Sequence, residues 1–172
     1  MNKAIECLLN RRSIRKYKSE QIKREELDAV LQAGVSAPTA KNLQSPIIVV
    51  VQDKETIAFM SKLNAQIMGV TSDPFYGAPT VLVVLADAKN PNAVADGSLV
   101  MGNLMNAAYA TGLGSCWINR AKELFEMPEG KELLARWGIE GDYIGVGNCI
   151  LGYADETPQM KTRKENYVYY VL

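Results

Sequence analysis

The chain of 172 residues contains no histidine. This absence excludes histidine-dependent catalytic triads, acid–base catalysis by an imidazole and zinc sites of the usual composition. Cysteine is scarce as well: Cys7, Cys116 and Cys149 are odd in number and lack the spacing of metal ligands. We interpret them as reduced core thiols of a cytoplasmic protein with no bound metal. If the protein is an enzyme, a group other than its side chains is expected to carry the difficult chemistry.

Net charge and long apolar runs are also absent. Nineteen basic residues balance nineteen acidic ones, so no overall positive field attracts nucleic acid. No apolar stretch approaches the ~20 residues of a transmembrane helix, and residues 1–12 lack the apolar centre of a signal peptide. Neither G-x-G-x-x-G nor a P-loop motif occurs, so no standard nucleotide cradle is predicted. The length favours one domain, residues 1–172, with no membrane attachment.

A basic cluster follows the first helical pattern. Asn2 can cap a helix in which Ile5, Leu8 and Leu9 share one buried face. Residues 11–15, Arg-Arg-Ser-Ile-Arg, come directly after it. Guanidiniums bind phosphate through forked, bidentate hydrogen bonds, and a serine hydroxyl adds a donor, so this stretch predicts anion binding. On this stretch alone, a solvated basic run or a nucleic-acid patch is the alternative.

Strand and helix patterns are interleaved along the rest of the chain. Apolar, β-branched runs predict buried strands at 47–51, 80–86, 115–118 and within 143–153. Helical spacing predicts helices around 27–34, 57–67, 95–111, 122–125 and 129–137. Together they indicate a layered α/β or α+β domain. Residues 69–79 are rich in Gly, Pro, Ser and Asp, which predicts a loop, with a lid as one possible role.

Two segments are more apolar than a single chain of this size requires. Residues 95–111 are small or apolar on nearly every face, which predicts a helix buried on all sides. A subunit interface is the economical explanation. Residues 166–172, NYVYYVL, are apolar on both strand faces, although chain ends are usually polar and frayed. We therefore expect this end of the chain to be docked.

Four motifs occur in register along the chain. They are RRSIR at 11–15, APTAKNLQ at 37–44, GLGSCWI at 112–118, and LGY at 151–153 followed by KTRK at 161–164. In this order they resemble the nitroreductase family of FMN-dependent oxidoreductases. The resemblance implies an α+β three-layer sandwich, with a central mixed β-sheet flanked by helices. It also implies an intertwined homodimer with exchanged C-terminal strands and two FMN sites at the interface.

The resemblance implies two groups of cofactor residues and no catalytic side chain. At the phosphate end it implies Arg11, Arg12, Ser13, Lys161 and Arg163. Around the ring it implies Arg15, Asn64, Trp117, Ile118 and Asn119, joined by Pro38, Thr39, Ala40 and Asn42 of the other subunit. Arg15 would reach the N1/O2 side of the flavin, where a cation stabilises the negative charge of the reduced ring. A backbone N–H of residues 117–119 would lie near N5.

Plainer interpretations of some of these residues stay open. Trp117 and Ile118 could be core strand residues, and Lys161 and Arg163 a solvated tail. Asn42 and Gln44 could be turn residues that close a helix. The chain also departs from the family after Gln44: Ser45-Pro46 stands where the family often has Pro-Trp, so an aromatic is missing.

The resemblance implies an FMN-dependent oxidoreductase that takes hydride from NADH or NADPH. An electron-poor acceptor such as a nitroaromatic or quinone then takes the same place on the flavin. Three alternatives are open. One is other flavin chemistry on this scaffold, such as reductive dehalogenation or flavin breakdown. The second is a flavin-binding protein without turnover, and the third a nucleic-acid-binding module built on residues 11–18.

Overall fold

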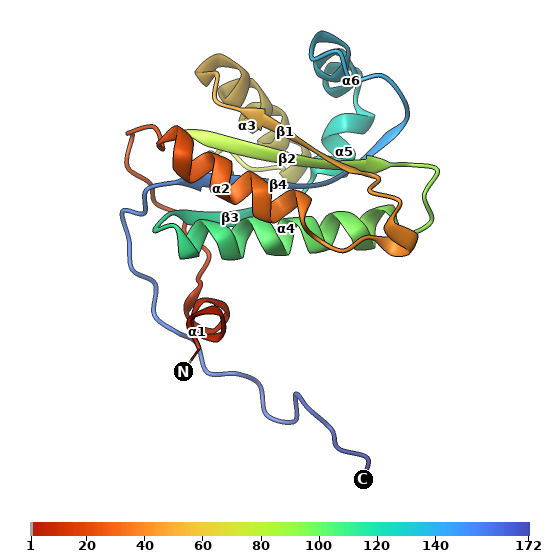
Figure 1. Ribbon diagram of the computed structural model, residues 1–172. Helices are drawn as coiled ribbons and strands as arrows, with labels where there is room; N and C mark the ends of the chain where they lie inside the picture. Colours follow the sequence, from red (N-terminus) through yellow and green to blue (C-terminus); the bar gives the residue numbers. More distant parts are fainter. Residues whose placement is uncertain (1) are drawn as a thin grey trace.

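Helices cover both faces of a four-stranded sheet in the computed structural model, which describes residues 2–172 (Figure 1). The strands lie in the order β1 (Pro46–Val51), β2 (Thr80–Asp87), β4 (Tyr143–Gly152) and β3 (Gly114–Ile118). The helices are α1 (Lys3–Asn10), α2 (Arg24–Val35), the short η1 (Ala40–Asn42), α3 (Lys54–Met68), α4 (Ala93–Ala110), α5 (Ala121–Glu126) and α6 (Pro128–Arg136). The four strands and the helices predicted from the periodicity of residues 2–153 are therefore confirmed, with bounds shifted by a few residues.

The central strand β2 explains the three layers. Its side chains alternate between the two faces of the sheet. Val81, Val83 and Leu85 pack into the core shared with α3, α5 and α6. Leu82 and Val84 pack into the core shared with α2 and α4. Because both faces are covered, the strand reads as a continuous apolar run, and the predicted α+β three-layer sandwich is confirmed.

The strand ladders are all antiparallel, which differs from the mixed sheet expected. Within residues 2–172 the parallel component is a single bridge between Ser13 and Ser115, on the outer edge of β3. There the Ile14 N–H donates to the Ser115 carbonyl at 3.0 Å. The Ile14 side chain fills the space beside Gly114, where a Cβ would lie 2.9 Å from it. The basic cluster is thus fixed against the sheet.

Helix α1 begins as predicted but does not bury its apolar face. Asn2 caps it by accepting from the Ala4 N–H at 2.8 Å. Ile5, Leu8 and Leu9 are 47%, 54% and 49% exposed, because α1 lies outside α4 and contacts it on one side only. The predicted burial of this face is wrong for the single chain.

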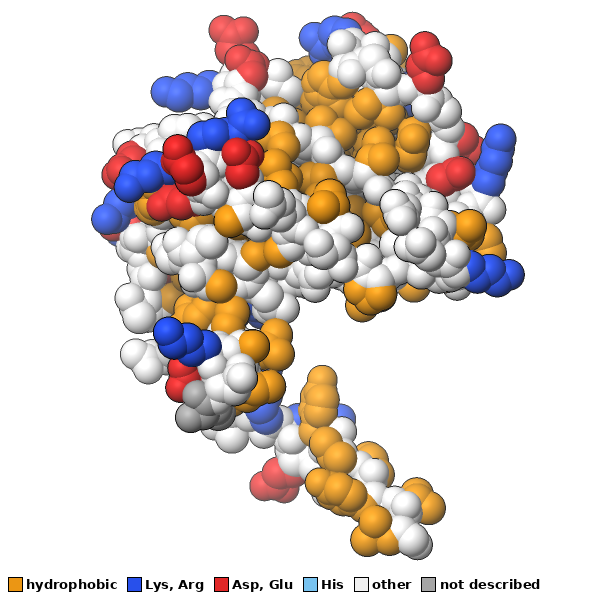
Figure 2. All heavy atoms as spheres, viewed as in Figure 1, with side chains coloured by type: hydrophobic (Ala, Val, Ile, Leu, Met, Phe, Trp, Pro, Cys, Tyr) orange, Lys and Arg blue, Asp and Glu red, His pale blue; other side chains and the backbone are white. Residues whose placement is uncertain are grey.

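The same correction applies to α4 and to the C-terminal segment. Helix α4 buries one face through residues such as Val100, Met101 and Leu104, while Leu99 on the other side is 48% exposed. Residues 166–172 form no strand and are fully or largely exposed, and they stand away from the body (Figures 1 and 2). The predicted burial of this helix on all sides and the predicted docking of residues 166–172 are therefore both absent from a single chain. Within residues 2–172, no helix combines the length and apolarity needed to cross a bilayer.

Candidate cofactor site

The basic cluster runs as an extended segment along the edge of β3. Alternate side chains of an extended segment point to opposite sides. Ile14 points into the protein and is 7% exposed, whereas Arg11 and Ser13 are partly exposed and Arg15 is exposed. The structure therefore places three of the predicted residues along one extended segment, the Arg11–Arg15 row.

A cavity of about 260 Å³ lies at the Arg11 end of this row. Its lining includes Arg11, Arg12, Ser115 and Tyr109, and also one carboxylate, that of Glu156. Arg11 Nη1 and Ser115 Oγ are buried and have no hydrogen-bond partner among residues 2–172. Buried donors without partners are costly, and phosphate oxygens are the acceptors that would satisfy both. This donor set fits a terminal phosphate group.

Arg12 is already engaged within its own helix end. Its Nη1 donates to the carbonyls of Leu9 and Arg11, each at 2.7 Å. A cation bound to the last carbonyls of a helix stabilises its C-terminus. Arg12 thus stabilises the end of α1; it also lines the cavity, and its contact with a phosphate stays a prediction.

A second cavity, of about 220 Å³, lies at the Arg15 end of the row. Its lining is neutral or basic: Arg15, Met68, Pro74, Tyr76, Cys116, Trp117, Ile118, Asn119 and Arg120. Four predicted ring-side residues therefore meet here. At ~3.3 Å per strand residue, Ser115 and Ile118 are roughly 10 Å apart. The two cavities suit an elongated ligand with a phosphate at one end and a planar ring at the other.

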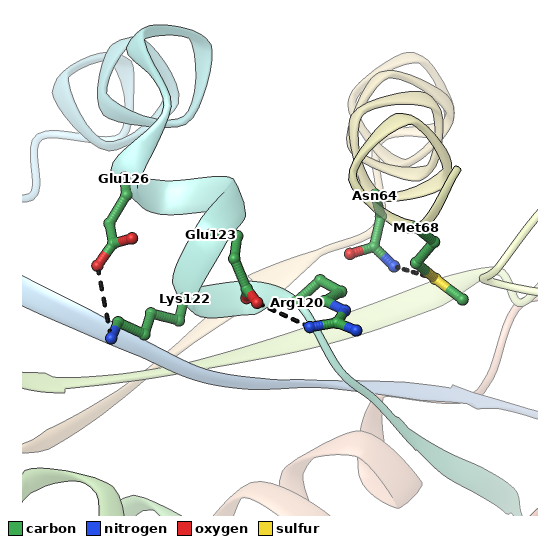
Figure 3. Close-up of polar contacts among 6 residues, drawn as sticks. All are labelled: Asn64, Met68, Arg120, Lys122, Glu123 and Glu126. Carbon is green, nitrogen blue, oxygen red and sulfur yellow. Dashed lines mark hydrogen bonds and ion pairs between the residues drawn. The ribbon is translucent and has the colours of Figure 1, made fainter. Parts of the chain in front are cut away.

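Trp117 and Ile118 use their side chains for the core. Trp117 packs against the α2–α4 core and Ile118 belongs to the opposite one, so the plainer interpretation holds for their side chains. Any role toward a ring falls to their backbone. Asn64, also a predicted ring-side residue, is fully buried and donates to Met68 Sδ at 3.7 Å (Figure 3). Asn64 Oδ1 and Trp117 Nε1 have no partner among residues 2–172.

Residues 38–44 form a strained turn between α2 and β1. Lys41, Asn42 and Gln44 have positive φ angles of 53°, 54° and 50°. The Gln44 N–H donates to Thr39 Oγ1 at 3.0 Å, and the Gln44 amide donates to Asn42 Oδ1 at 3.1 Å. Asn42 and Gln44 are therefore turn residues, as the plainer interpretation has it. Backbone strain of this kind persists only where the surroundings impose it, and it clusters at ligand clamps.

The anchor of this turn is Asp96 on α4, which sequence reasoning missed. Its carboxylate is buried and accepts from the Ala40 N–H at 2.9 Å and from the Asn90 amide at 3.0 Å. The available signal was a single carboxylate on an otherwise apolar helix. Asp96 thus fixes Thr39 and Ala40 at the N-terminal end of α4.

The turn and the row of arginines lie at opposite ends of α4. Asp96 holds the turn, and Tyr109, thirteen residues later, lines the Arg11 cavity. At 1.5 Å per helical residue the two ends are about 20 Å apart. One chain therefore does not bring Pro38, Thr39, Ala40 and Asn42 to Arg11 or Arg15.

Lys161 and Arg163 are not brought to Arg11 either. Both are exposed on the C-terminal segment, which runs past α1 and away from the body (Figure 1). In the described residues neither forms an ion pair. Within one chain they are a solvated tail, as the plainer interpretation has it.

The site offers no nucleophile or acid–base pair. Cys116 and Cys149 are free and buried, and burial raises the pKa of Cys149 to about 12, so it stays a thiol. Burial also raises the pKa of Tyr17, whose hydroxyl donates to the Ile14 carbonyl at 2.7 Å. The Glu156 carboxylate, also missed from sequence, accepts from the Arg15 N–H. Such an arrangement binds and orients a group that brings its own chemistry.

Comparison with known proteins agrees with this geometry. The family model described as the nitroreductase family matches residues 8–153. The chain belongs to the nitroreductase family.

Two similar proteins and one solved structure show how far the likeness extends. A protein of Archaeoglobus fulgidus, named as a candidate NADH dehydrogenase/NAD(P)H nitroreductase, is 32% identical over 89% of this chain and 86% of its own length. The NADPH-flavin oxidoreductase of Vibrio harveyi is 28% identical over 98% of this chain and 72% of its own. The crystal structure of a nitroreductase with bound FMN from Bacteroides fragilis superposes with a TM-score of 0.92, at 25% identity over the whole of both chains.

Proposed function

We propose that the chain is an FMN-dependent NAD(P)H oxidoreductase that works as a homodimer. The observation that carries this is the buried, unpartnered pair Arg11 Nη1 and Ser115 Oγ, at one end of a row that leads to a ring-sized cavity with Arg15. The relatives support it, because their names include a nitroreductase with bound FMN and an NADPH-flavin oxidoreductase. FMN, when bound, supplies the acceptance and release of hydride.

The residues of this chain bind and orient the cofactor. Arg11, Ser13 and Ser115 would hold the phosphate through charge-assisted and neutral hydrogen bonds. Arg15 would place a positive charge at the ring edge, and the backbone of residues 117–119 would lie along the ring. Asn64, whose Oδ1 has no partner in the described chain, would accept from the ring edge behind Met68.

In the proposed dimer, the partner subunit would supply the ring-side residues that one chain does not bring to its own Arg11 row. If two copies pack their exposed α4 faces in antiparallel orientation, the N-terminal end of one α4 meets the C-terminal end of the other. The partner subunit's residues 38–42 would then lie beside this chain's Arg11 row. The exposed apolar faces of α1 and α4 supply the surface, through Ile5, Leu8, Leu9, Leu99 and Tyr109.

The electron acceptor is proposed as a planar, electron-poor molecule such as a nitroaromatic or quinone. The 220 Å³ cavity, which would hold the flavin ring, is lined by two arginines, Tyr76 and apolar side chains and, among the described residues, by no carboxylate. The nicotinamide donor and the electron acceptor would occupy the same place on the flavin, one after the other.

The first prediction is that the purified protein is yellow, with one FMN per chain and ping-pong kinetics. NADH or NADPH should bleach the flavin spectrum without oxygen, and adding a nitroaromatic or quinone should restore it. The measurements are the visible spectrum, anaerobic titration, and initial rates over a grid of donor and acceptor concentrations, where parallel reciprocal plots are expected. A colourless protein that does not take up FMN contradicts the proposal. A yellow protein that never oxidises NAD(P)H would be a flavin-binding protein without turnover. Turnover with halogenated aromatics alone would favour dehalogenation.

The second prediction concerns the charge of Arg15. A cation at the N1/O2 edge stabilises reduced flavin more than oxidised flavin, so Arg15→Gln should lower the two-electron potential by tens of millivolts. The estimate takes about 1–3 kcal/mol for a charged hydrogen bond and about 30 mV per 1.4 kcal/mol. Spectroelectrochemical titration at saturating FMN measures it. Lys16→Gln is the matched control, since Lys16 is an exposed neighbour paired with Asp155 at 2.9 Å. Equal potentials in both variants would place Arg15 away from the ring.

A further inference from the structure

Arg120 lies at the turn between β3 and α5, and sequence reasoning gave it no role. Its backbone is left-handed, with φ 77° and ψ 11°, although it is not a glycine. Non-glycine residues hold this conformation only where the surrounding structure imposes it, and such residues are concentrated at ligand clamps. The Arg120 side chain lines the 220 Å³ cavity and also the neighbouring cavity that Glu123 lines.

The Arg120 guanidinium is paired with one carboxylate within the chain, through one of its N–H groups. Its Nη1 donates to Glu123 Oε1 at 2.9 Å, and the two side chains are 50% and 42% exposed. An ion pair at this exposure is weak, and a guanidinium carries five N–H donors, so most of them stay free. Figure 3 shows the guanidinium on the side of α5 that faces Asn64 and Met68 of α3.

The cavity that Arg120 shares with Arg15 contains two cations and no carboxylate. Glu123 and Glu156, which bind Arg120 and the Arg15 N–H, line the two neighbouring cavities instead. A cavity lined by charges of one sign raises the local concentration of the opposite charge. Arg15 is assigned to the edge of the proposed flavin ring. Arg120 has no ligand assigned to it so far.

An aromatic side chain lines the same cavity as this second cation. Asp73 shapes the loop between α3 and β2 by accepting from Ser61 Oγ, from the Phe75 N–H at 2.8 Å and from the Gly77 N–H at 2.7 Å. The loop thereby holds Tyr76 at φ 53°, 41% exposed, as the second left-handed residue that lines the cavity. A tyrosine face beside a guanidinium fits a planar molecule that carries an oxyanion.

We propose that Arg120 is a specificity-determining residue that binds a carboxylate or phosphate group of the substrate while the substrate's reactive ring lies against Tyr76. The proposal rests on the proposed function and deepens it: the preferred substrates are planar and anionic. The oxyanion has two possible sources, the electron acceptor or the phosphates of the nicotinamide donor. The shared chemistry is the guanidinium–oxyanion pair.

The test compares matched charged and neutral substrates on FMN-loaded wild type and Arg120→Gln. For the acceptor arm, 4-nitrobenzoate and 4-nitrobenzamide are reduced with the neutral donor 1-benzyl-1,4-dihydronicotinamide. For the donor arm, NADH and NADPH are compared with that neutral donor, using 4-nitrobenzamide as acceptor. Loss of one charge-assisted hydrogen bond should raise KM for the charged substrate roughly 10- to 100-fold in one arm. KM for the neutral substrates should change less than about twofold.

Three controls keep the result interpretable. Glu123→Gln keeps the cation and removes its intrachain partner, so KM for the charged substrate should stay or fall. Arg120→Lys should recover part of the effect. Arg120→Gly removes the charge and relieves the left-handed backbone, so it should match Arg120→Gln in KM while unfolding at an equal or higher temperature.

Two outcomes overturn the proposal. One is an equal effect of Arg120→Gln on charged and neutral substrates. The other is a changed FMN affinity or potential with all substrates slowed alike, which would make Arg120 a residue that positions the flavin. If wild type reduces no acceptor at all, the proposed function fails together with this inference. Turnover of 4-nitrobenzamide without discrimination by Arg120→Gln refutes the inference alone.

Discussion

Arg11→Ala combined with Arg163→Ala is expected to release FMN almost completely. Arg11 Nη1 is buried without a partner, and Arg163 lies on the segment that we propose reaches the phosphate in the dimer. Each charge-assisted hydrogen bond to a phosphate is worth about 1.5–3 kcal/mol. Losing two should weaken FMN binding by roughly 10²- to 10⁴-fold, at 1.4 kcal/mol per factor of ten. Titration of the apoprotein with FMN, followed by flavin fluorescence, measures the change.

The matched control for this variant removes two cations that have no proposed contact with the cofactor. Arg136 is exposed on α6 and Lys164 is exposed beside Arg163, so Arg136→Ala with Lys164→Ala changes net charge equally. This control should keep FMN affinity within a few-fold of wild type. If the Arg11/Arg163 variant also retains stoichiometric FMN at unchanged affinity, the phosphate is held elsewhere. A fall in affinity with both variants would show only a general charge effect.

The sequence predicts the layers of this fold well because the strands are buried on both faces. Residues 80–86 read as an unbroken apolar run, and the structure has β2 at Thr80–Asp87. The row of Arg11, Ser13 and Arg15 was also predictable, since it rests on local alternation. The hydrogen-bond partners of the individual arginines in this row could not be predicted from the sequence. Arg12 turns back to the carbonyls of Leu9 and Arg11, and composition alone does not separate it from Arg11.

The missed residues depend on contacts between distant parts of the chain. Asp96 matters because it binds the Ala40 N–H, 56 positions earlier. Arg120 matters because its side chain lines a cavity built from three separate segments. Periodicity also shows which face of α1 or α4 is apolar but not what covers it. That is why burial was predicted for faces that a single chain leaves exposed.

The free edge of the sheet offers a place where the exposed C-terminal segment would dock in the proposed dimer. The outer edge of β3 is partly covered by the Ser13–Ser115 bridge, whereas β1 is the other edge strand of the sheet. An open edge pairs readily with an added strand. Residues 167–172 match the six residues of β1 in length. Each of their side chains is either apolar or a tyrosine. We therefore expect the tail of each subunit to add a strand beside the partner's β1.

Deletion of residues 166–172 should therefore abolish the stable dimer and, with it, FMN binding. The deletion removes exposed side chains, those of residues 167–172 being 64–113% exposed in one chain, so it takes nothing from the monomer's own core. Sedimentation at micromolar concentration should show a species near the monomer mass of 18.9 kDa, without flavin absorbance. Val168→Ser with Tyr170→Ser keeps the length and backbone pairing, so it should weaken the dimer less than the deletion. Leu99→Asn tests the α4 contact separately. A truncated chain that still sediments as an FMN-loaded dimer would refute strand exchange while leaving α4 as the interface.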